Sequence, residues 1–246
     1  MGKRVKFLNT FVDALTMDET LEEIQKYIES KQCVQHVVIN ASKVNLMQED
    51  EELTKIINDC PLINADGQSV VWGSKFLGNP LPERVSGIDI FTELVKISAE
   101  KGYKPYFFGA KEEVVTEVVR RFKKQYPNLN VAGYRNGYFK DEESESIAEE
   151  IRKSGADILF VAFSSPKKEF WIKEHMEIMQ VPFAMGVGGS FDVIAGKTKR
   201  APVWMQKSGL EWFYRFIQEP RRMFRRYIVG NLKFCALVGK EKIRGV

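Results

Sequence analysis

The chain has 246 residues, 44% hydrophobic and 28% charged, so it is long and apolar enough for one large α/β domain or one domain with an appendage. No run approaches the ~18 consecutive apolar residues of a transmembrane helix, and residues 1–9 are too short and polar for a signal peptide. Three scattered cysteines and two histidines offer no metal-ligand spacing, so we expect a cytoplasmic protein without structural zinc.

The net charge of +4 is divided unevenly along the chain. Residues 197–246 contain 13 Lys+Arg and 3 Asp+Glu, a net charge of +10, whereas residues 1–196 carry a net charge of −6. This difference predicts a core over residues 1–196 and a basic appendage over residues 197–246. The basic charge indicates an anionic partner for the appendage: a membrane surface, a nucleic acid or a phosphorylated substrate.

The N-terminal elements follow from apolar spacing. Residues 5–15 predict a small hairpin, because two apolar runs flank a polar pair. Thr16 and Glu19 form a capping box, after which apolar residues at helical spacing predict a helix over residues 17–31. Residues 36–40 (HVVIN) then predict a buried strand.

That strand ends in Asn40, and a second short strand, near residues 61–65, ends in Asp66 and Gly67. Residues 41–60 between the two strands are mostly helical in pattern. Ligands of doubly wound sheets bind outside the carboxyl ends of strands, so Asn40 and Asp66 are expected to share one edge. Asn-x-Asp-Gly is also ordinary turn chemistry, and the residues alone favour that simpler interpretation.

Arg84 lies in a proline-punctuated loop just before a helix expected over residues 87–101. It could clamp a phosphate or a sugar, although an arginine in such a place is more often a surface residue. A strand near residues 106–108 follows and ends in Gly109 and Ala110. Beyond it the pattern predicts a helix, a strand over 130–134, a turn at Gly137-Tyr138 and an acidic helix over 141–153.

Residues 157–163 (DILFVAF) are the most strongly predicted buried strand. They lead into Ser165, which suits a helix N-cap, and Pro166, which suits the first helical position. Strands and helices thus alternate along the chain, which predicts a parallel sheet covered on both faces.

The stretch VPFAMGVGGSFDVIAGKTKRAP, residues 181–202, is the most informative. An apolar run predicts a strand, and Gly186, Gly188 and Gly189 would let the backbone turn with positive φ close to a ligand. Ser190 would open a helix whose free amides face phosphate oxygens. A simple reversal of the chain explains this segment equally well.

The composition of the chain changes after Pro202, where aromatic and basic residues become frequent. Aromatic and apolar residues over 204–217 predict an amphipathic helix, which Pro220 interrupts before arginines interleaved with aromatics at 221–227. This pattern favours a helix lying in a membrane interface over one docked on the body with a solvated basic face.

Six segments together resemble the WecG/TagA/CpsF glycosyltransferases, glycosyltransferase family twenty-six, in the family's order and over nearly the whole chain. The pair GVGGSFDVIAGKTKRAP and GLEWFYR is highly specific, whereas NADG alone is not. The six segments are NADG (64–67), PLPERVSG (80–87), FGA (108–110), SPKKEFW (165–171), GVGGSFDVIAGKTKRAP (186–202) and GLEWFYR (209–215).

The resemblance implies a Rossmann-like three-layer α/β/α fold with a mostly parallel sheet and a helical basic C-terminal appendage. It implies an inverting, metal-independent transferase without cofactor, which moves a sugar from a UDP-sugar to a polyprenyl-diphosphate-linked acceptor at the inner face of the bacterial cell membrane. Such enzymes build teichoic acid linkage units, common antigen, capsule or exopolysaccharide. N-acetylmannosamine is the first expectation for the sugar, with a UDP-hexose donor such as UDP-glucose, UDP-galactose or a UDP-uronic acid as the alternative. No nucleic-acid partner is implied, and a homo-oligomer is left open.

The resemblance also assigns roles to residues. The catalytic base falls on Asp66. Diphosphate or acceptor binding falls on Arg215, Arg222 and Arg225. The donor-binding positions are Asn40, Arg84, Gly109, Ala110, Tyr138, Ser165, Pro166, Lys168, Glu169, Gly186, Val187, Gly188, Gly189 and Asp192. Two departures from the family's pattern put the donor sugar in doubt: Val38 stands where a threonine is usual, and Lys168 replaces a glutamine.

No two aspartates of the chain lie two positions apart, so the metal-binding Asp-x-Asp motif of many UDP-sugar enzymes is absent. Helix N-termini, glycine-loop amides and arginines would then stabilise the charge that develops on UDP. Two other classes remain. A nicotinamide-dependent oxidoreductase would need a glycine at Phe191, and a nucleic-acid binder would use the basic tail but shows no recognised module.

Overall fold

The computed structural model describes residues 3–245, without the side chains of Lys207, Arg222, Met223, Arg225, Arg226 and Tyr227. The strands are β1 (Arg4–Phe7), β2 (Thr10–Asp13), β3 (Val34–Ile39), β4 (Leu62–Ala65), β5 (Pro105–Gly109), β6 (Gly133–Arg135), β7 (Ile158–Ala162) and β8 (Phe183–Gly186). Within the described residues, β1 and β2 form an antiparallel hairpin, and six strands form a parallel sheet in the order β4-β3-β8-β7-β5-β6.

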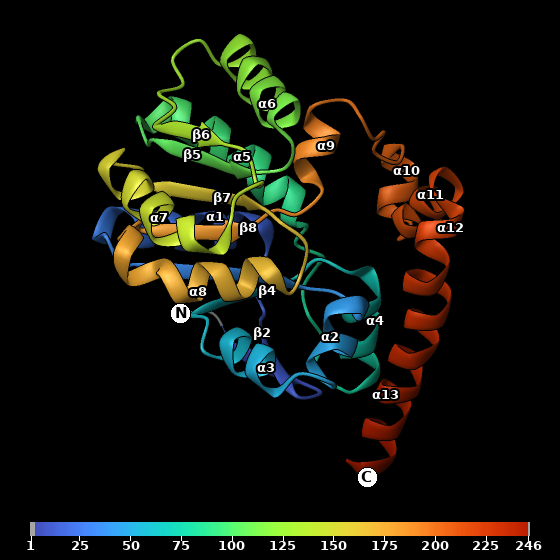
Figure 1. The fold of residues 1–246 in the computed structure, drawn as a ribbon. Helices are drawn as coiled ribbons and strands as arrows, with labels where there is room; N and C mark the ends of the chain where they lie inside the picture. Colours follow the sequence, from blue (N-terminus) through green and yellow to red (C-terminus); the bar gives the residue numbers. More distant parts are fainter. Residues whose placement is uncertain (1–2, 246) are drawn as a thin grey trace.

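Helices cover both faces of this sheet (Figure 1), which confirms the expected three-layer α/β/α fold. The helices of the core are α1 (Met17–Ser30), α2 (Ala41–Met47), α3 (Glu51–Asn58), α4 (Gln68–Phe76), α5 (Gly87–Lys101), α6 (Glu112–Gln125), α7 (Ser144–Lys153, after the 3₁₀ turn η1, Asp141–Glu143), α8 (Lys167–Met179) and α9 (Ser190–Ile194). The C-terminal helices are α10 (Val203–Lys207), α11 (Glu211–Gln218), α12 (Pro220–Met223), the π-helical turn η2 (Phe224–Val229) and α13 (Gly230–Arg244).

Local signals explain several of these bounds. The Thr16 hydroxyl accepts a hydrogen bond from the Glu19 amide and the Glu19 carboxylate accepts one from the Thr16 amide, so the predicted capping box starts α1. The strand predicted over residues 130–134 is displaced, because β6 begins only at Gly133. A side chain at Gly133 would bring its Cβ to 2.5 Å from Tyr106 Cε2, so this edge strand pairs with β5 only where the residue is glycine.

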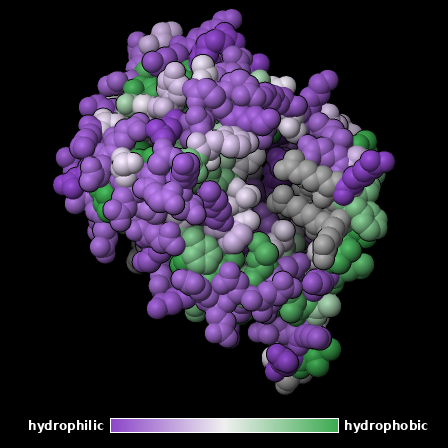
Figure 2. All heavy atoms as spheres, in the orientation of Figure 1, coloured by the Kyte–Doolittle hydropathy of each residue, from purple (hydrophilic) through white to green (hydrophobic). Residues whose placement is uncertain are grey.

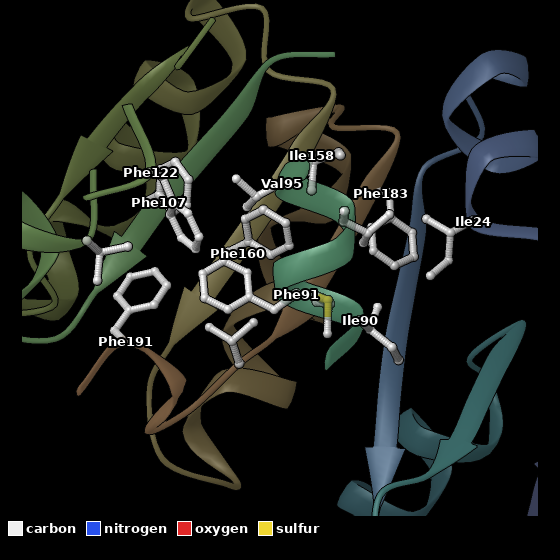
Figure 3. Close-up of a cluster of buried hydrophobic side chains, with 14 of the residues drawn as sticks. Ile24, Ile90, Phe91, Val95, Phe107, Phe122, Ile158, Phe160, Phe183 and Phe191 are labelled. Carbon is white, nitrogen blue, oxygen red and sulfur yellow. The ribbon is translucent and has the colours of Figure 1, made fainter. Parts of the chain in front are cut away.

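One face of the sheet is covered by α1, α5 and α6 around a cluster of phenylalanines (Figure 3). Phe91 of α5 is fully buried there, with its ring centroid 4.6 Å from that of Phe160 on β7 and 5.6 Å from that of Phe191 on α9. Burying one such side chain contributes about 1.5–3 kcal/mol. The cluster therefore fixes the position of α5, whose N-terminus reaches the site described below.

The opposite face carries α7, α8 and the β1-β2 hairpin. Trp171 of α8 packs edge-on against Phe108 of β5, with ring centroids 4.8 Å apart. The hairpin is tied to the edge strand β4 because the Asp13 carboxylate accepts a hydrogen bond of 2.7 Å from the Ile63 amide. Covering the edge of the sheet in this way removes a surface that would otherwise pair with another chain.

The C-terminal helices lie along one side of the body (Figure 1). Phe234 and Val238 of α13 are buried against the core, and the Phe234 ring lies 6.1 Å from that of Phe7. The single amphipathic helix predicted over residues 204–217 is wrong: α10 and α11 are separated at Gly209, which has φ 73°. A Cβ at Gly209 would lie 2.7 Å from Gln68 Cγ of α4, so the chain turns against the body there. No helix within residues 3–245 is long and apolar enough to cross a membrane.

Candidate active site

Several of the residues expected to bind substrate lie at one edge of the sheet, because parallel strands end on the same side. Asn40 follows β3 and Asp66 follows β4, and these strands are neighbours with Ile39 opposite Ala65. The predicted shared edge is thus confirmed. Gly109 ends β5 and Ala110 follows it, Ser165 lies beyond β7, and Gly186 ends β8 at the same edge.

Asp66 is held at the N-terminus of α5. Its amide donates to the Ile39 carbonyl at 2.9 Å, and its carboxylate oxygen Oδ1 accepts a hydrogen bond of 3.2 Å from the Gly87 amide. A helix N-terminus favours a negative charge, so the hydrogen bond from Gly87 positions the carboxylate at the start of α5. The side chain is half-buried, which leaves it within reach of a substrate.

Asn40 has a structural task at the same edge. Its Oδ1 accepts a hydrogen bond of 3.1 Å from the Lys43 amide and so caps α2. A Cβ at Gly67 would lie 3.1 Å from Asn40 Cβ, which shows how closely the turns after β3 and β4 pack. The turn interpretation therefore accounts for part of both segments.

The neighbouring Asn64 belongs to the core, although it stands in the NADG segment. It is fully buried, accepts from His36 Nε2 at 2.9 Å and donates to the Thr20 hydroxyl at 3.0 Å. Burial lowers the pKa of His36 to about 4, so its imidazole is neutral near pH 7. This network joins β3, β4 and α1 beneath the site.

The glycine loop after β8 differs from its prediction. Only Gly188 has a positive φ, 51°, whereas Gly189 has φ −72°. Gly186 is needed for another reason: the aliphatic part of Lys168 crosses it, and a Cβ there would lie 2.5 Å from Lys168 Cδ. The helix α9 does begin at Ser190, as predicted.

Some of the amides of this loop already donate hydrogen bonds to carbonyl groups of the protein. Val187 donates to the Val161 carbonyl at 2.9 Å, and Ser190 donates to the Val187 carbonyl at 3.1 Å. The amides that the loop offers to a ligand are therefore at most those of Gly188 and Gly189. Asp192, on α9, holds the following segment through its carbonyl, which accepts from the amides of Lys197 and Thr198.

The start of α8 is also different from the prediction. The helix begins at Lys167, with Pro166 in the N-cap position, and the Ser165 hydroxyl donates to Glu169 Oε1 at 3.1 Å. Ser165 is thus not the N-cap, because its oxygen is directed at a buried carboxylate and not at a helix amide. The segment is built around Glu169.

Glu169 forms a buried ion pair that the sequence did not reveal. Lys43 Nζ lies 2.6 Å from Glu169 Oε1, and the two side chains are only 4% and 2% exposed. Lys168 Nζ lies 3.9 Å from the same oxygen. Burial opposes ionisation of Glu169, but the charges of Lys43 and Lys168 outweigh it and hold its pKa below the usual value.

A cluster of arginines lies where the C-terminal helices meet the site. Arg84 Nη1 lies 3.0 Å from Glu211 Oε2, while Arg200 Nε and Arg215 Nη2 each lie 3.8 Å from Glu211 Oε1. Arg200 also forms two hydrogen bonds to the Asp89 carboxylate in the first turn of α5. The structure thus brings Arg84 and Arg215, predicted separately, onto one carboxylate.

Arg200, Asp89 and Glu211 were not identified from the sequence. Burial disfavours the charge of Arg200, yet Asp89, Glu211 and Asp66 more than offset that cost and raise its pKa. The negative charge of Asp66 therefore helps to stabilise the positive charge of Arg200. Its place in the segment GVGGSFDVIAGKTKRAP was the available signal.

The remaining predicted residues have separate positions. Tyr138 is 70% exposed, and its loop lies on the end of β5, since a Cβ at Gly137 would be 3.0 Å from Gly109 Cα. The side chains of Arg222 and Arg225 lie outside the described residues. Among the side chains that are described, no three His, Cys, Asp or Glu residues are grouped to hold a metal ion.

Comparison with known proteins identifies a family and two similar proteins. Residues 5–246 match the family described as Glycosyl transferase WecG/TagA/CpsF family. A protein of Bacillus spizizenii strain W23 is 37% identical over 183 residues, covering 72% of this chain and 70% of that protein. A protein of Bacillus subtilis strain 168 is 32% identical over 235 residues, covering 96% of this chain and 87% of that protein. Both are named N-acetylglucosaminyldiphosphoundecaprenol N-acetyl-beta-D-mannosaminyltransferase.

Proposed function

Because this chain belongs to the WecG/TagA/CpsF family of glycosyltransferases, we propose that it transfers N-acetylmannosamine from its UDP derivative to N-acetylglucosaminyl-diphosphoundecaprenol. The sugar and the acceptor follow from the names of the two relatives. The observation that carries the reaction type is the position of Asp66, a half-buried carboxylate held at the N-terminus of α5, at the end of β4 and beside the end of β3.

In the proposed reaction Asp66 acts as the general base. The acceptor hydroxyl attacks the anomeric carbon on the face opposite UDP, its proton passes to the Asp66 carboxylate, and the bond to UDP breaks with its electron pair leaving on the diphosphate. This displacement inverts the anomeric configuration. Arginines at the site and the amides of Gly188 and Gly189 would stabilise the charge on the leaving group without a metal ion.

One observation favours a different donor. The ammonium group of Lys168 reaches to 3.5 Å from the position of a Cβ at Gly188, so a cation lies beside the loop offered to the donor. A positive charge there would suit an acidic sugar. Val38, whose side chain packs against Gly87, has no hydroxyl with which to bind a sugar. Among the alternative UDP-hexose donors, a UDP-uronic acid is therefore the second candidate.

The donor is tested by measuring UDP release with a short-chain lipid-diphosphate N-acetylglucosamine acceptor and a panel of UDP-sugars. UDP-N-acetylmannosamine is expected to give the highest kcat/KM, and the same rate is expected in the presence of a chelator. A higher kcat/KM for a UDP-uronic acid would move the assignment to the second candidate. No release with any donor, in the presence of acceptor, would contradict the proposed activity.

We also place the protein on the inner surface of the cell membrane, where its lipid-linked acceptor resides. Figure 2 shows hydrophobic side chains along the outer edge of the C-terminal helices. Trp204 is 64% exposed and Ile217 60% exposed on α10 and α11, and Trp72 of α4, packed beside Gly209, is 57% exposed. Exposed aromatics within a strongly basic segment suit an interface of anionic lipid.

Replacing Trp204 with serine is expected to weaken binding to vesicles of phosphatidylcholine and phosphatidylglycerol by about tenfold, since burying a large apolar side chain contributes ~1.5–3 kcal/mol. Co-sedimentation with vesicles measures the effect. Tyr134→Ser is the matched control, because Tyr134 is 44% exposed on β6 at the far edge of the sheet. If the two variants lost vesicle binding equally, the C-terminal helices would not be the part of the protein that contacts the membrane.

A further inference from the structure

Glu211 is an unusual member of the arginine cluster because it is the shared counter-ion of three guanidinium groups. Arg84 forms a direct ion pair with its Oε2 at 3.0 Å, and Arg200 and Arg215 flank its Oε1 at 3.8 Å. Glu211 comes from the C-terminal part of the chain, whereas Arg84 precedes α5 in the body. The carboxylate therefore joins the C-terminal helices to the rim of the site.

The cluster is closed in this state. The side chain of Glu211 is 13% exposed and that of Arg84 is 16% exposed. Glu211 thus occupies one face of the guanidinium group of Arg84, where an incoming anion would otherwise bind. An anion that bound Arg84 through Nη1 would have to take the place of Glu211.

We propose that Glu211 occupies the position of the donor's diphosphate between Arg84, Arg200 and Arg215, and that the bound diphosphate displaces it. The proposal rests on the proposed function, since it names the subsite for the diphosphate of a UDP-sugar. It adds Arg200 to that subsite and gives Glu211 an autoinhibitory role.

The chemistry of the groups supports this exchange. A carboxylate and a phosphate both present oxygens in the spacing that a guanidinium group binds through two N–H donors, so one can substitute for the other. A diphosphate carries more negative charge than one carboxylate, so it competes well for three arginines. Arg200 would stay in place during the exchange because Asp89 holds it, with one hydrogen bond of 2.8 Å between Arg200 Nη2 and Asp89 Oδ2.

The exchange would couple the donor to the C-terminal helices. Glu211 lies in the first turn of α11, so breaking its pair with Arg84 releases a direct tie between α11 and the body. The helices that expose Trp204 and Ile217 would then be freer to adjust when the donor is bound. Membrane contact and donor binding would in this way influence each other.

A structural role for Glu211 makes the opposite prediction. If Glu211 served to orient Arg84 for the donor, removing its charge would weaken the binding of UDP. If it competes with the diphosphate, removing its charge strengthens the binding of UDP and leaves uridine, which has no phosphate, unaffected. The ratio of the two affinities therefore separates the two roles.

The test is to measure the affinities of UDP and uridine by calorimetry for the wild type and for Glu211→Gln. The affinity for UDP is expected to rise roughly fivefold or more, the low end of usual coupling factors, with the affinity for uridine unchanged. The matched control is Glu117→Gln, because Glu117 also pairs with two arginines, Arg120 and Arg121, but on the surface of α6. The control is expected to leave both affinities as in the wild type.

An unchanged or lower UDP-to-uridine affinity ratio in Glu211→Gln would overturn the inference while leaving the transferase assignment intact. A wild type that binds neither UDP nor uridine would overturn the proposed function as well. Should Glu211→Gln fail to fold, Glu211→Asp keeps the charge at the start of α11 but withdraws it from Arg84 by one methylene. That variant is expected to bind UDP at least about twofold more tightly, and tighter binding of uridine by the same factor would count against the exchange.

Discussion

Replacing Asp66 with asparagine is expected to lower the rate of sugar transfer by ~100-fold or more, the usual scale for the loss of a general base. Asparagine has the same shape and still accepts the hydrogen bond that the Gly87 amide gives to Asp66 Oδ1. The local structure is therefore retained, and only the capacity to take a proton is lost. Steady-state rates with UDP-N-acetylmannosamine and a lipid-diphosphate acceptor measure the change.

The affinity for UDP is expected to stay close to that of the wild type in this variant, because Asp66 is assigned to the acceptor and not to the nucleotide. Asp59→Asn is a suitable control, since Asp59 is an exposed aspartate at the end of α3. If the transfer rate of Asp66→Asn were within a few-fold of that of the control, Asp66 would not be the general base.

The second large effect concerns stability. Replacing Lys43 with methionine is expected to lower the free energy of unfolding by about 3–5 kcal/mol, because it takes from the buried carboxylate of Glu169 its nearest cation. Denaturant unfolding at pH 7 measures the loss. Lys101→Met is the control, as its pair with Glu29 is exposed and should contribute at most about 1 kcal/mol.

Two further measurements identify the buried charge as the cause. The double variant Lys43→Met with Glu169→Gln is expected to recover much of the stability, because no charge is then buried alone. The loss in Lys43→Met is also expected to shrink as the pH falls. Burial raises the pKa of Glu169 and the charge of Lys43 lowers it, so removing Lys43 shifts that pKa upward in the folded state and folding then takes up a proton. A loss in Lys43→Met that is independent of pH would point to packing and not to charge.

Much of the core could be predicted from local pattern. The apolar run of β7, the capping box of α1 and the alternation of strands with helices depend on residues close together in sequence, and each was found as expected. The rule that ligands bind outside the carboxyl ends of parallel strands then placed Asn40 and Asp66 at one edge, and the register of β3 with β4 confirms it.

The parts that sequence did not reveal depend on contacts between distant segments. Lys43 and Glu169 are 126 residues apart, and Arg84 and Glu211 are 127 apart, so no spacing rule brings them together. The prediction for Ser165 was wrong for a local reason, because its hydroxyl donates to Glu169, four residues further along the chain, and does not accept from a helix amide. Gly186 likewise makes room for the chain of Lys168 and does not supply a positive φ.

The C-terminal helices show how tertiary contact overrides periodicity. Their apolar spacing alone suggests one helix, but Gly209 breaks it where α4 leaves no space for a side chain. The break turns α11 so that Glu211 meets Arg84 and Arg215 meets Glu211. A substitution that restored helix at Gly209 would therefore disturb the site and not only the fold.

A crystal structure of the protein with UDP and a lipid-diphosphate acceptor analogue tests the central claim most directly. The account predicts that an Asp66 carboxylate oxygen lies about 2.6–3.2 Å from the acceptor hydroxyl, as a general base must. A complex in which that hydroxyl faces another side chain, with Asp66 still bound only to the Gly87 amide, would contradict it.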